Sequence, residues 1–86
     1  MSHPTTIPQY PRNMEDLAQD VACLRYDKVA EFLGHLSKEL QKQKDGDEAR
    51  GRVQLASRLE ETVRALSFAK DRMWETWNLC APYERE

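Results

Sequence analysis

Residues 56–80, ASRLEETVRALSFAKDRMWETWNLC, decide the fold because they contain no Gly or Pro and repeat apolar residues with a helical period. Two sets of positions at seven-residue spacing form the heptad pattern of a helix that packs against another helix. The first set is Ala49, Ala56, Val63, Lys70 and Trp77, and the second is Leu59, Leu66, Met73 and Cys80. Pro82 disfavours continuation of the helix, so we expect it to end near Cys80.

The chain has a second helical pattern between Met14 and Lys44. Asn13 is a favoured N-cap residue, and acidic residues follow it in the first turn of the predicted helix. Apolar residues then recur at alternating steps of three and four, which is one face of a long helix. They are Ala18, Ala22, Tyr26, Val29, Leu33, Leu36 and Leu40.

We expect the chain to reverse between the two helices at Gly46, where a left-handed glycine ends the first helix and Asp47 caps the next. Folding the chain about Gly46 pairs positions whose numbers sum to about 92, because the loop is short. An alternative stays open, in which Asp27 is a second N-cap and the first helix is broken beside it.

These elements predict an all-α fold, an antiparallel two-helix hairpin with helices over about 14–44 and 48–80. Three of the four prolines fall within the first 11 residues, so we expect residues 1–12 to form an extended, Pro-rich N-terminal arm. The helical hairpin domain then covers residues 13–81, and residues 82–86 form a C-terminal tail.

The bulk composition gives no general reason to expect nucleic acid or a membrane as a partner. The 13 basic and 15 acidic residues are spread along the chain and leave a formal charge of −2. The N-terminus lacks the charged and apolar regions of a secretory signal, and no apolar run approaches the length of a membrane span. We therefore expect a cytoplasmic protein in which Cys23 and Cys80 are reduced thiols without a disulfide between them.

One cluster is chemically able to hold a divalent metal. Glu31, His35 and Glu39 are four residues apart and share one helical face. Lysines lie close enough to pair with the carboxylates, and the Glu-x-x-His motifs of di-metal bundles are absent from the sequence. We expect a solvated charged face with no metal and no cofactor. Since no nucleophile has a neighbouring His in the predicted hairpin, we expect no catalytic residues and no enzyme activity.

A row of arginines along the second helix raises the possibility of nucleic-acid binding. The row is Arg50, Arg52, Arg58, Arg64 and Arg72, and the carboxylates among them are Glu60, Glu61, Asp71 and Glu75. Because the two charges interleave, the pattern favours a surface of salt bridges over a continuous basic stripe. A small helical nucleic-acid-associated regulator is therefore the runner-up function, followed by a metal-dependent helical-bundle enzyme.

The most informative feature of this sequence is that it has more apolar residues at helical spacing than a seam between two helices needs. Outside the seam between the two helices, further apolar residues occur at Met14, Leu17, Val21, Phe32, Leu55, Phe68 and Trp74. This apolar stripe is wider than contact with one partner helix requires, so a second surface must cover it. We expect a homodimer that forms a four-helix bundle, a binding face for a different protein, or both.

The sequence thus predicts a non-catalytic protein–protein interaction module, such as a small regulator or inhibitor that occupies a partner protein's surface. Aromatic side chains are good anchors for recognition, and we expect several to gather at the end of the hairpin. The candidate partner-binding residues are Trp74, Trp77, Tyr10, Phe32 and Phe68.

Overall fold

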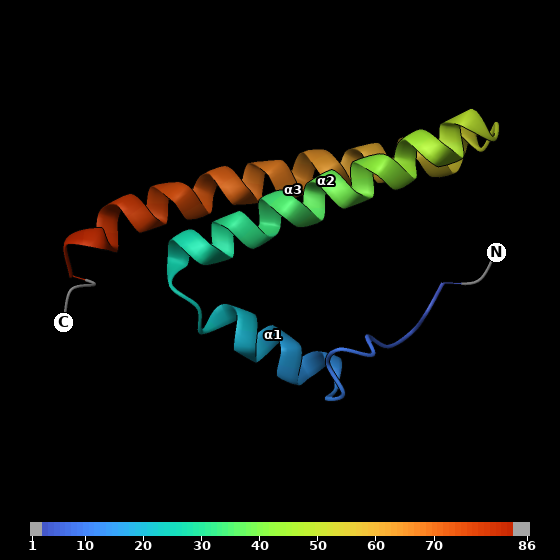
Figure 1. Cartoon of the computed structure of the whole chain (residues 1–86). Coiled ribbons are helices and arrows are strands. Elements are labelled where there is room, and N and C mark those ends of the chain that lie inside the picture. Colours follow the sequence, from blue (N-terminus) through green and yellow to red (C-terminus); the bar gives the residue numbers. More distant parts are fainter. Residues whose placement is uncertain (1–2, 84–86) are drawn as a thin grey trace.

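The computed structural model describes residues 3–83, and within them the secondary structure is helical, with no β-strand longer than an isolated bridge (Figure 1). The elements are α1 (Met14–Ala22), α2 (Tyr26–Ala49), α3 (Val53–Cys80) and the 3-10 turn η1 (Ala81–Tyr83). Helices α2 and α3 lie side by side and antiparallel, which confirms the prediction of an all-α fold with a helical hairpin. Residues 1–2 of the predicted arm and 84–86 of the predicted tail lie outside the described residues.

The N-terminal cap and the C-terminal end of the helical region are where the sequence predicts them. The side chain of Asn13 accepts a hydrogen bond of 2.7 Å from the backbone N–H of Asp16, so Asn13 is the N-cap of α1. Helix α3 ends at Cys80, two residues before Pro82. Both positions are set by local chemistry, a side-chain cap in one case and the steric effect of proline in the other.

The prediction of one long first helix over about 14–44 was wrong. Helix α1 ends at Ala22, and Cys23–Arg25 connect it to α2. Arg25 has extended backbone angles, and its guanidinium holds the Asp27 carboxylate with bonds of 2.7 and 2.8 Å. The break therefore resembles the alternative with an N-cap at Asp27, except that Asp27 lies in the first turn of α2, where a negative charge is also favourable.

The prediction that the chain reverses at Gly46 was also wrong, because α2 continues through Gly46 to Ala49. The reversal is centred on Gly51, whose φ of 80° is the left-handed conformation that glycine adopts easily. The N–H of Gly51 donates to the carbonyl of Glu48 at 3.0 Å, and that of Arg52 donates to the carbonyl of Asp47 at 2.9 Å. These two bonds form a Schellman motif, so Gly51 ends α2. Helix α3 therefore starts at Val53, and the predicted start at about residue 48 was wrong.

Moving the reversal to Gly51 changes the register of the hairpin by about ten residues. The pairs Ser37–Val63, Lys44–Glu60 and Arg25–Trp77 have numbers that sum to 100, 104 and 102. The predicted register, in which paired positions have numbers that sum to about 92, was therefore wrong.

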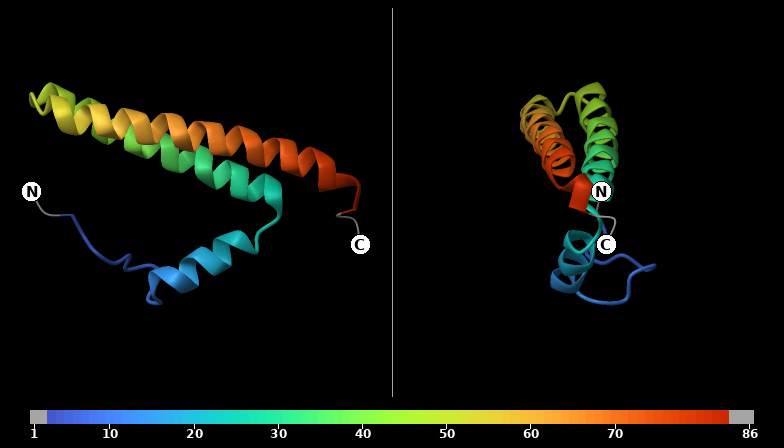
Figure 2. Two further views of the ribbon diagram at one scale, coloured as in Figure 1. Left: turned by 180° about the vertical axis from the view of Figure 1, so that it is seen from behind. Right: turned by 90° about the vertical axis from the view of Figure 1, so that its left-hand side faces the viewer.

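The molecule is long and thin, with extents of 51 × 29 × 14 Å. Its radius of gyration of 15.6 Å exceeds the value of about 12 Å typical of a compact domain of this length. Both views in Figure 2 show why: the hairpin is a single layer of two helices, and α1 with the arm stands apart from it. Helix α1 makes almost no contact with α2 or α3.

No helix in the described part of the chain combines the length and the apolar character needed to cross a membrane.

Candidate interaction surface

The seam between α2 and α3 is built from small residues. Ala30 and Ser37 of α2 and Ala56 of α3 are the buried side chains among residues 3–83. The hydroxyl of Ser37 donates to the carbonyl of Val63 across the seam at 3.3 Å. Because small side chains let two helices approach closely, the larger apolar side chains lie beside the seam and not within it.

Lys70 is the long side chain that crosses the seam. A Cβ at Gly34 would lie 3.2 Å from its Cδ, so the absence of a side chain at Gly34 makes room for the lysine stem. The Nζ of Lys70 reaches 3.5 Å from the carboxylate of Asp71. In the predicted register, with a sum of about 92, Lys70 would face Ala22; in the structure it faces Gly34.

Helical periodicity places large apolar side chains of both helices on one side of the seam, and we call this set the apolar face. It consists of Val29, Phe32, Leu36 and Leu40 from α2 with Leu55, Leu59, Leu66 and Met73 from α3. At about 100° per residue, the members of the apolar face in each helix lie roughly a quarter-turn around the helix from its buried alanine, which is Ala30 in α2 and Ala56 in α3. The rotation has the same direction in both helices when each is viewed from its own N-terminus. Since the two helices are antiparallel, equal displacements place both sets on the same side of the hairpin.

The apolar face is open in the single chain. Phe32 is 42%, Leu36 37% and Leu55 48% exposed, and the other members of the face are half-buried. No large side chain is fully buried among the described residues. The hairpin therefore lacks a core that shields its own apolar side chains from water.

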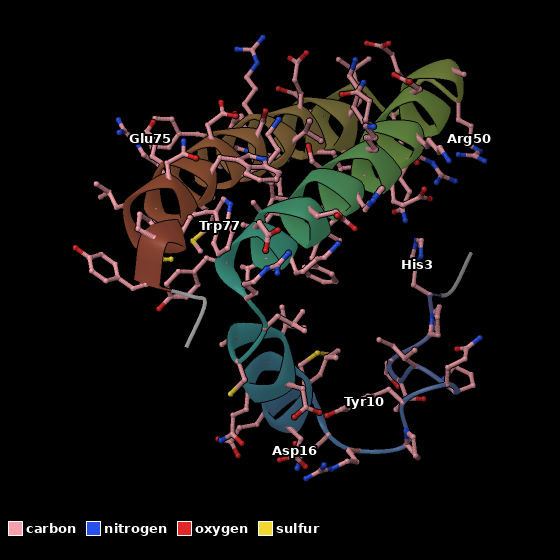
Figure 3. All side chains as sticks on the ribbon, turned by 60° about the vertical axis from the view of Figure 1, so that its left-hand side comes forward. His3, Tyr10, Asp16, Arg50, Glu75 and Trp77 are labelled. Atoms are coloured by element: carbon pink, nitrogen blue, oxygen red, sulfur yellow. The ribbon has the colours of Figure 1, made fainter. Side chains whose placement is uncertain are left out.

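The N-terminal arm lies on the same side of the hairpin as the apolar face. His3 lines a surface hollow together with Leu55 and Gln43 near the tip of the hairpin. Figure 3 shows His3 on the arm, facing the end of the hairpin that carries Arg50. The arm and α1 are thus placed beneath the apolar face without packing on it.

Ion pairs occupy the tip of the hairpin, its outer edges and the side opposite the apolar face. The five arginines considered for nucleic-acid binding each lie within 4 Å of a carboxylate. The pairs are Arg50–Asp47 at 3.6 Å, Arg52–Asp47 at 3.3 Å, Arg58–Glu61 at 3.5 Å, Arg64–Glu60 at 3.8 Å and Arg72–Glu75 at 2.9 Å. This is the surface of salt bridges that the interleaved charges indicate.

The five predicted partner-binding residues do not form one cluster. Phe32 belongs to the apolar face, whereas Phe68 is 61% exposed on the outer edge of α3, beneath the guanidinium of Arg72 at 4.9 Å. Trp74 lines a polar hollow on the other side of the hairpin, and Tyr10 is in the arm. Only Phe32 is on the surface that most needs a partner.

Trp77 is half-buried at the open end of the hairpin, where it anchors the start of α2. The guanidinium of Arg25 lies 5.0 Å from the centre of its ring, a cation–π contact. The same guanidinium hydrogen-bonds Asp27, and this bond is the main reason that the pKa of Asp27 is lowered from 3.8. Arg25 therefore links the first turn of α2 to the last turns of α3.

Tyr10 ties the arm to α1. Its hydroxyl donates a hydrogen bond to Asp20, and this bond is the main cause of a pKa raised above 10.0. The backbone N–H of Tyr10 also donates to the carbonyl of Ile7 at 2.9 Å, closing a tight turn. The predicted extended arm is thus folded back against α1 in the part that the structure describes.

The candidate metal ligands lie on the exposed surface of α2. Glu31 is 3.3 Å from the Nζ of Lys28, and Glu39 is 3.0 Å from that of Lys42. His35 is also exposed. No group of three or more His, Cys, Asp or Glu side chains within residues 3–83 is placed to hold a metal ion. Cys23 and Cys80 are both free thiols.

The apolar excess in the sequence places Phe32 and Leu55 outside the seam, but the heptad pattern does not assign Leu36 and Leu66 to the same surface. Leu36 and Leu66 were placed in the seam, since a large apolar residue at heptad spacing is normally a seam residue. The signal that could have placed them is the row of small residues Ala30, Gly34 and Ser37, which marks the close contact on α2.

Comparison of this chain with protein families, with curated proteins and with solved structures gives no match.

Proposed function

We propose that this chain is a non-catalytic protein–protein interaction module whose working surface is the apolar face of the hairpin. The observation that carries the proposal is the absence of any fully buried large side chain among residues 3–83, combined with the exposure of Phe32, Leu36 and Leu55 on the apolar face. Exposed apolar surfaces of this kind, with polar and charged surroundings, are typical of sites that bind another protein.

The accessible surface supports a partner of considerable size. The chain exposes 7009 Å². A compact monomer of 10.1 kDa is expected to expose about 5,300 Å², which leaves an excess of roughly 1,700 Å². A standard interface buries about 800 Å² on each partner, and permanent dimers bury more. The excess therefore matches the surface that one chain contributes to a permanent dimer.

A second copy of the chain is the first partner that we propose. None of the eight members of the apolar face is charged, and Asp47, Arg50 and Arg52 lie beside Leu55 at the tip of the hairpin, so two such faces can stack away from the tip without burying a charge. Two hairpins stacked in this way form a four-helix bundle. In cells, the same face would let the chain act as a small regulator or inhibitor by occupying the apolar surface of a target protein.

The test compares two phenylalanines by sedimentation equilibrium of the full chain over a wide concentration range. Phe32→Asp places a charge on the apolar face and should raise the self-association Kd by about 30-fold, the effect of losing a hot-spot side chain. Phe68→Asp is the matched control, because Phe68 is more exposed than Phe32 but lies well over 100° around α3 from Leu66 and Met73. Its effect should stay within about threefold, as for a residue outside the interface.

Equal weakening by the two variants would contradict the assignment of the apolar face as the binding surface. A wild-type chain that sediments as a 10.1 kDa monomer at all concentrations would remove the second copy as the partner.

A further inference from the structure

Residues 3–22 form a small unit of their own, which we call the N-terminal unit. Within it the Ile7–Tyr10 turn folds the arm back, and Tyr10 is hydrogen-bonded to Asp20 of α1. Arg12 also pairs with Asp16 at 3.4 Å. Figure 3 shows Tyr10 directed from the arm toward α1. These contacts hold the unit together, but none of them reaches the hairpin.

The N-terminal unit lacks the packing that would make it stable alone. Helix α1 has nine residues, and isolated helices shorter than about 12 residues are marginal in water. Its apolar positions share one side of the helix, and one of them, Met14, is 64% exposed. Helix α1 also makes almost no contact with its own hairpin. Another surface must therefore support it.

The connection between the unit and the hairpin has a defined direction. Arg25 is fixed by its bonds to Asp27 and by its position over Trp77, so only Cys23 and Leu24 separate α1 from a firmly held residue. Leu24 is exposed at this elbow. The elbow directs α1 away from its own hairpin, and α1 and the arm lie on the same side of that hairpin (Figure 2). His3 of the arm lies beside Leu55 of the apolar face, so this is the side on which the apolar face opens.

A second hairpin stacked on the apolar face would occupy that same side of the molecule. It would meet the N-terminal unit of the first chain directly, since this unit stands off from its own hairpin on that side. The twofold arrangement of a homodimer would repeat this contact in the other direction.

We propose that the N-terminal unit is exchanged between two copies, so that α1 of each chain packs on the hairpin of the other. This inference rests on the proposed self-association through the apolar face and adds to it a second, swapped contact. Exchange of a terminal element on a short elbow is an inexpensive route to a stable dimer, because each copy buries the apolar side of the other's helix. It also supplies α1 with the support that its own hairpin does not give.

The first test uses a dimer mixed from isotope-labelled and unlabelled full-length chains. Isotope-filtered NOE spectra should show contacts between the methyl groups of Leu17 and Val21 in one chain and the hairpin of the other. Contacts confined to a single chain would overturn the exchange, because they would mean that α1 closes on its own hairpin.

The second test compares two aspartate substitutions in α1 by sedimentation of the full chain. Leu17→Asp puts a charge on the apolar side of α1 and should raise the dimer Kd by about tenfold or more. Gln19→Asp adds the same charge on the exposed, polar side of the same helix and should leave the Kd within about twofold. The far-ultraviolet circular dichroism of both variants should retain the signal of the hairpin.

An unchanged or tighter dimer for Leu17→Asp would refute the exchange. If Phe32→Asp still weakened that dimer, the interaction module would stand and only the exchange would fail. A wild-type chain that remained monomeric would refute the exchange together with self-association.

Discussion

Replacing Gly51 by Ala tests the position of the turn on which the whole hairpin depends. Gly51 has a φ of 80° and provides the left-handed residue of the Schellman motif. Nothing lies within 4 Å of a Cβ added there, so the cost comes from the backbone conformation alone. A non-glycine residue in this conformation costs about 1 to 2 kcal/mol, and we expect Gly51→Ala to lower the free energy of unfolding by that amount.

Gly46 is the matched control, because it lies inside α2 and is the glycine at which the sequence alone places the turn. An alanine there should raise the free energy of unfolding by up to about 1 kcal/mol, since alanine is the better helix former. Its Cβ would lie 3.1 Å from Nη1 of Arg50, the far end of a flexible exposed side chain that can move aside. The two substitutions should therefore act in opposite directions, although the glycines are only five residues apart.

The measurement is urea and thermal unfolding followed by far-ultraviolet circular dichroism, at one protein concentration because the chain is expected to self-associate. Each kcal/mol shifts the melting temperature of a domain of this size by roughly 4 to 8 °C, so the two variants should melt well apart. Stabilisation by Gly51→Ala with destabilisation by Gly46→Ala would refute the turn at Gly51 and the register that follows from it.

Two further predictions concern the aromatic residues. Trp77→Ala should lower the free energy of unfolding by about 3 kcal/mol, because Trp77 is half-buried at the open end of the hairpin beside the guanidinium of Arg25. Trp74→Ala, at a side chain 41% exposed, should lower it by about 1 kcal/mol. Equal losses in urea unfolding would contradict this difference. The hydrogen bond to Asp20 raises the pKa of Tyr10, so the folded state favours the protonated phenol; the link between the arm and α1 should be intact below pH 10.0 and be lost as the pH rises through the raised pKa. The absorbance of the Tyr10 tyrosinate, identified as the signal that is missing in Tyr10→Phe, should appear with a pKa above 10.0. Asp20→Asn should lower that pKa. A pKa of Tyr10 at or below 10.0 in the parent chain would refute the link.

The parts of the fold that the sequence predicts correctly depend on local chemistry. The heptad spacing of residues 56–80 and Pro82 define α3 and its end, and the Asn13 cap defines the start of α1. In each case the residue acts on its own backbone or on a neighbouring turn, so no knowledge of the tertiary structure is needed.

The position of the turn could not be predicted because the sequence contains two glycines, each flanked by charged residues, that are both suited to a turn. Gly46 and Gly51 are both able to end a helix, and acidic or basic residues flank each of them. Asp47 decides between them: its carboxylate lies within 4 Å of both Arg50 and Arg52, and its carbonyl accepts the closing bond of the Schellman motif. This arrangement exists only once the chain has folded, so intrinsic propensity does not reveal it.

The existence of an apolar interaction surface could be predicted from the sequence, but most of the residues that form it could not. The excess of apolar side chains indicated that a second surface must be covered, and Phe32 and Leu55 were assigned to it. Which other residues lie there depends on the seam, and the seam is centred on the small residues Ala30, Ser37 and Ala56. Heptad spacing normally identifies large apolar residues as the seam positions, and small residues contribute little to that pattern. The spacing therefore placed Leu36 in the seam, whereas it lies on the open apolar face.

The most direct test of the central claim is whether the apolar face is covered in solution. In nuclear magnetic resonance with a soluble paramagnetic agent, relaxation enhancement reports the access of solvent to each side chain. The side chains of Phe32 and Leu36, open in the single chain, should be protected, while Phe68, on the outer edge of α3, should be strongly enhanced. Enhancement of all three in proportion to their exposure in the single chain would contradict the claim, because the apolar face would then be bare.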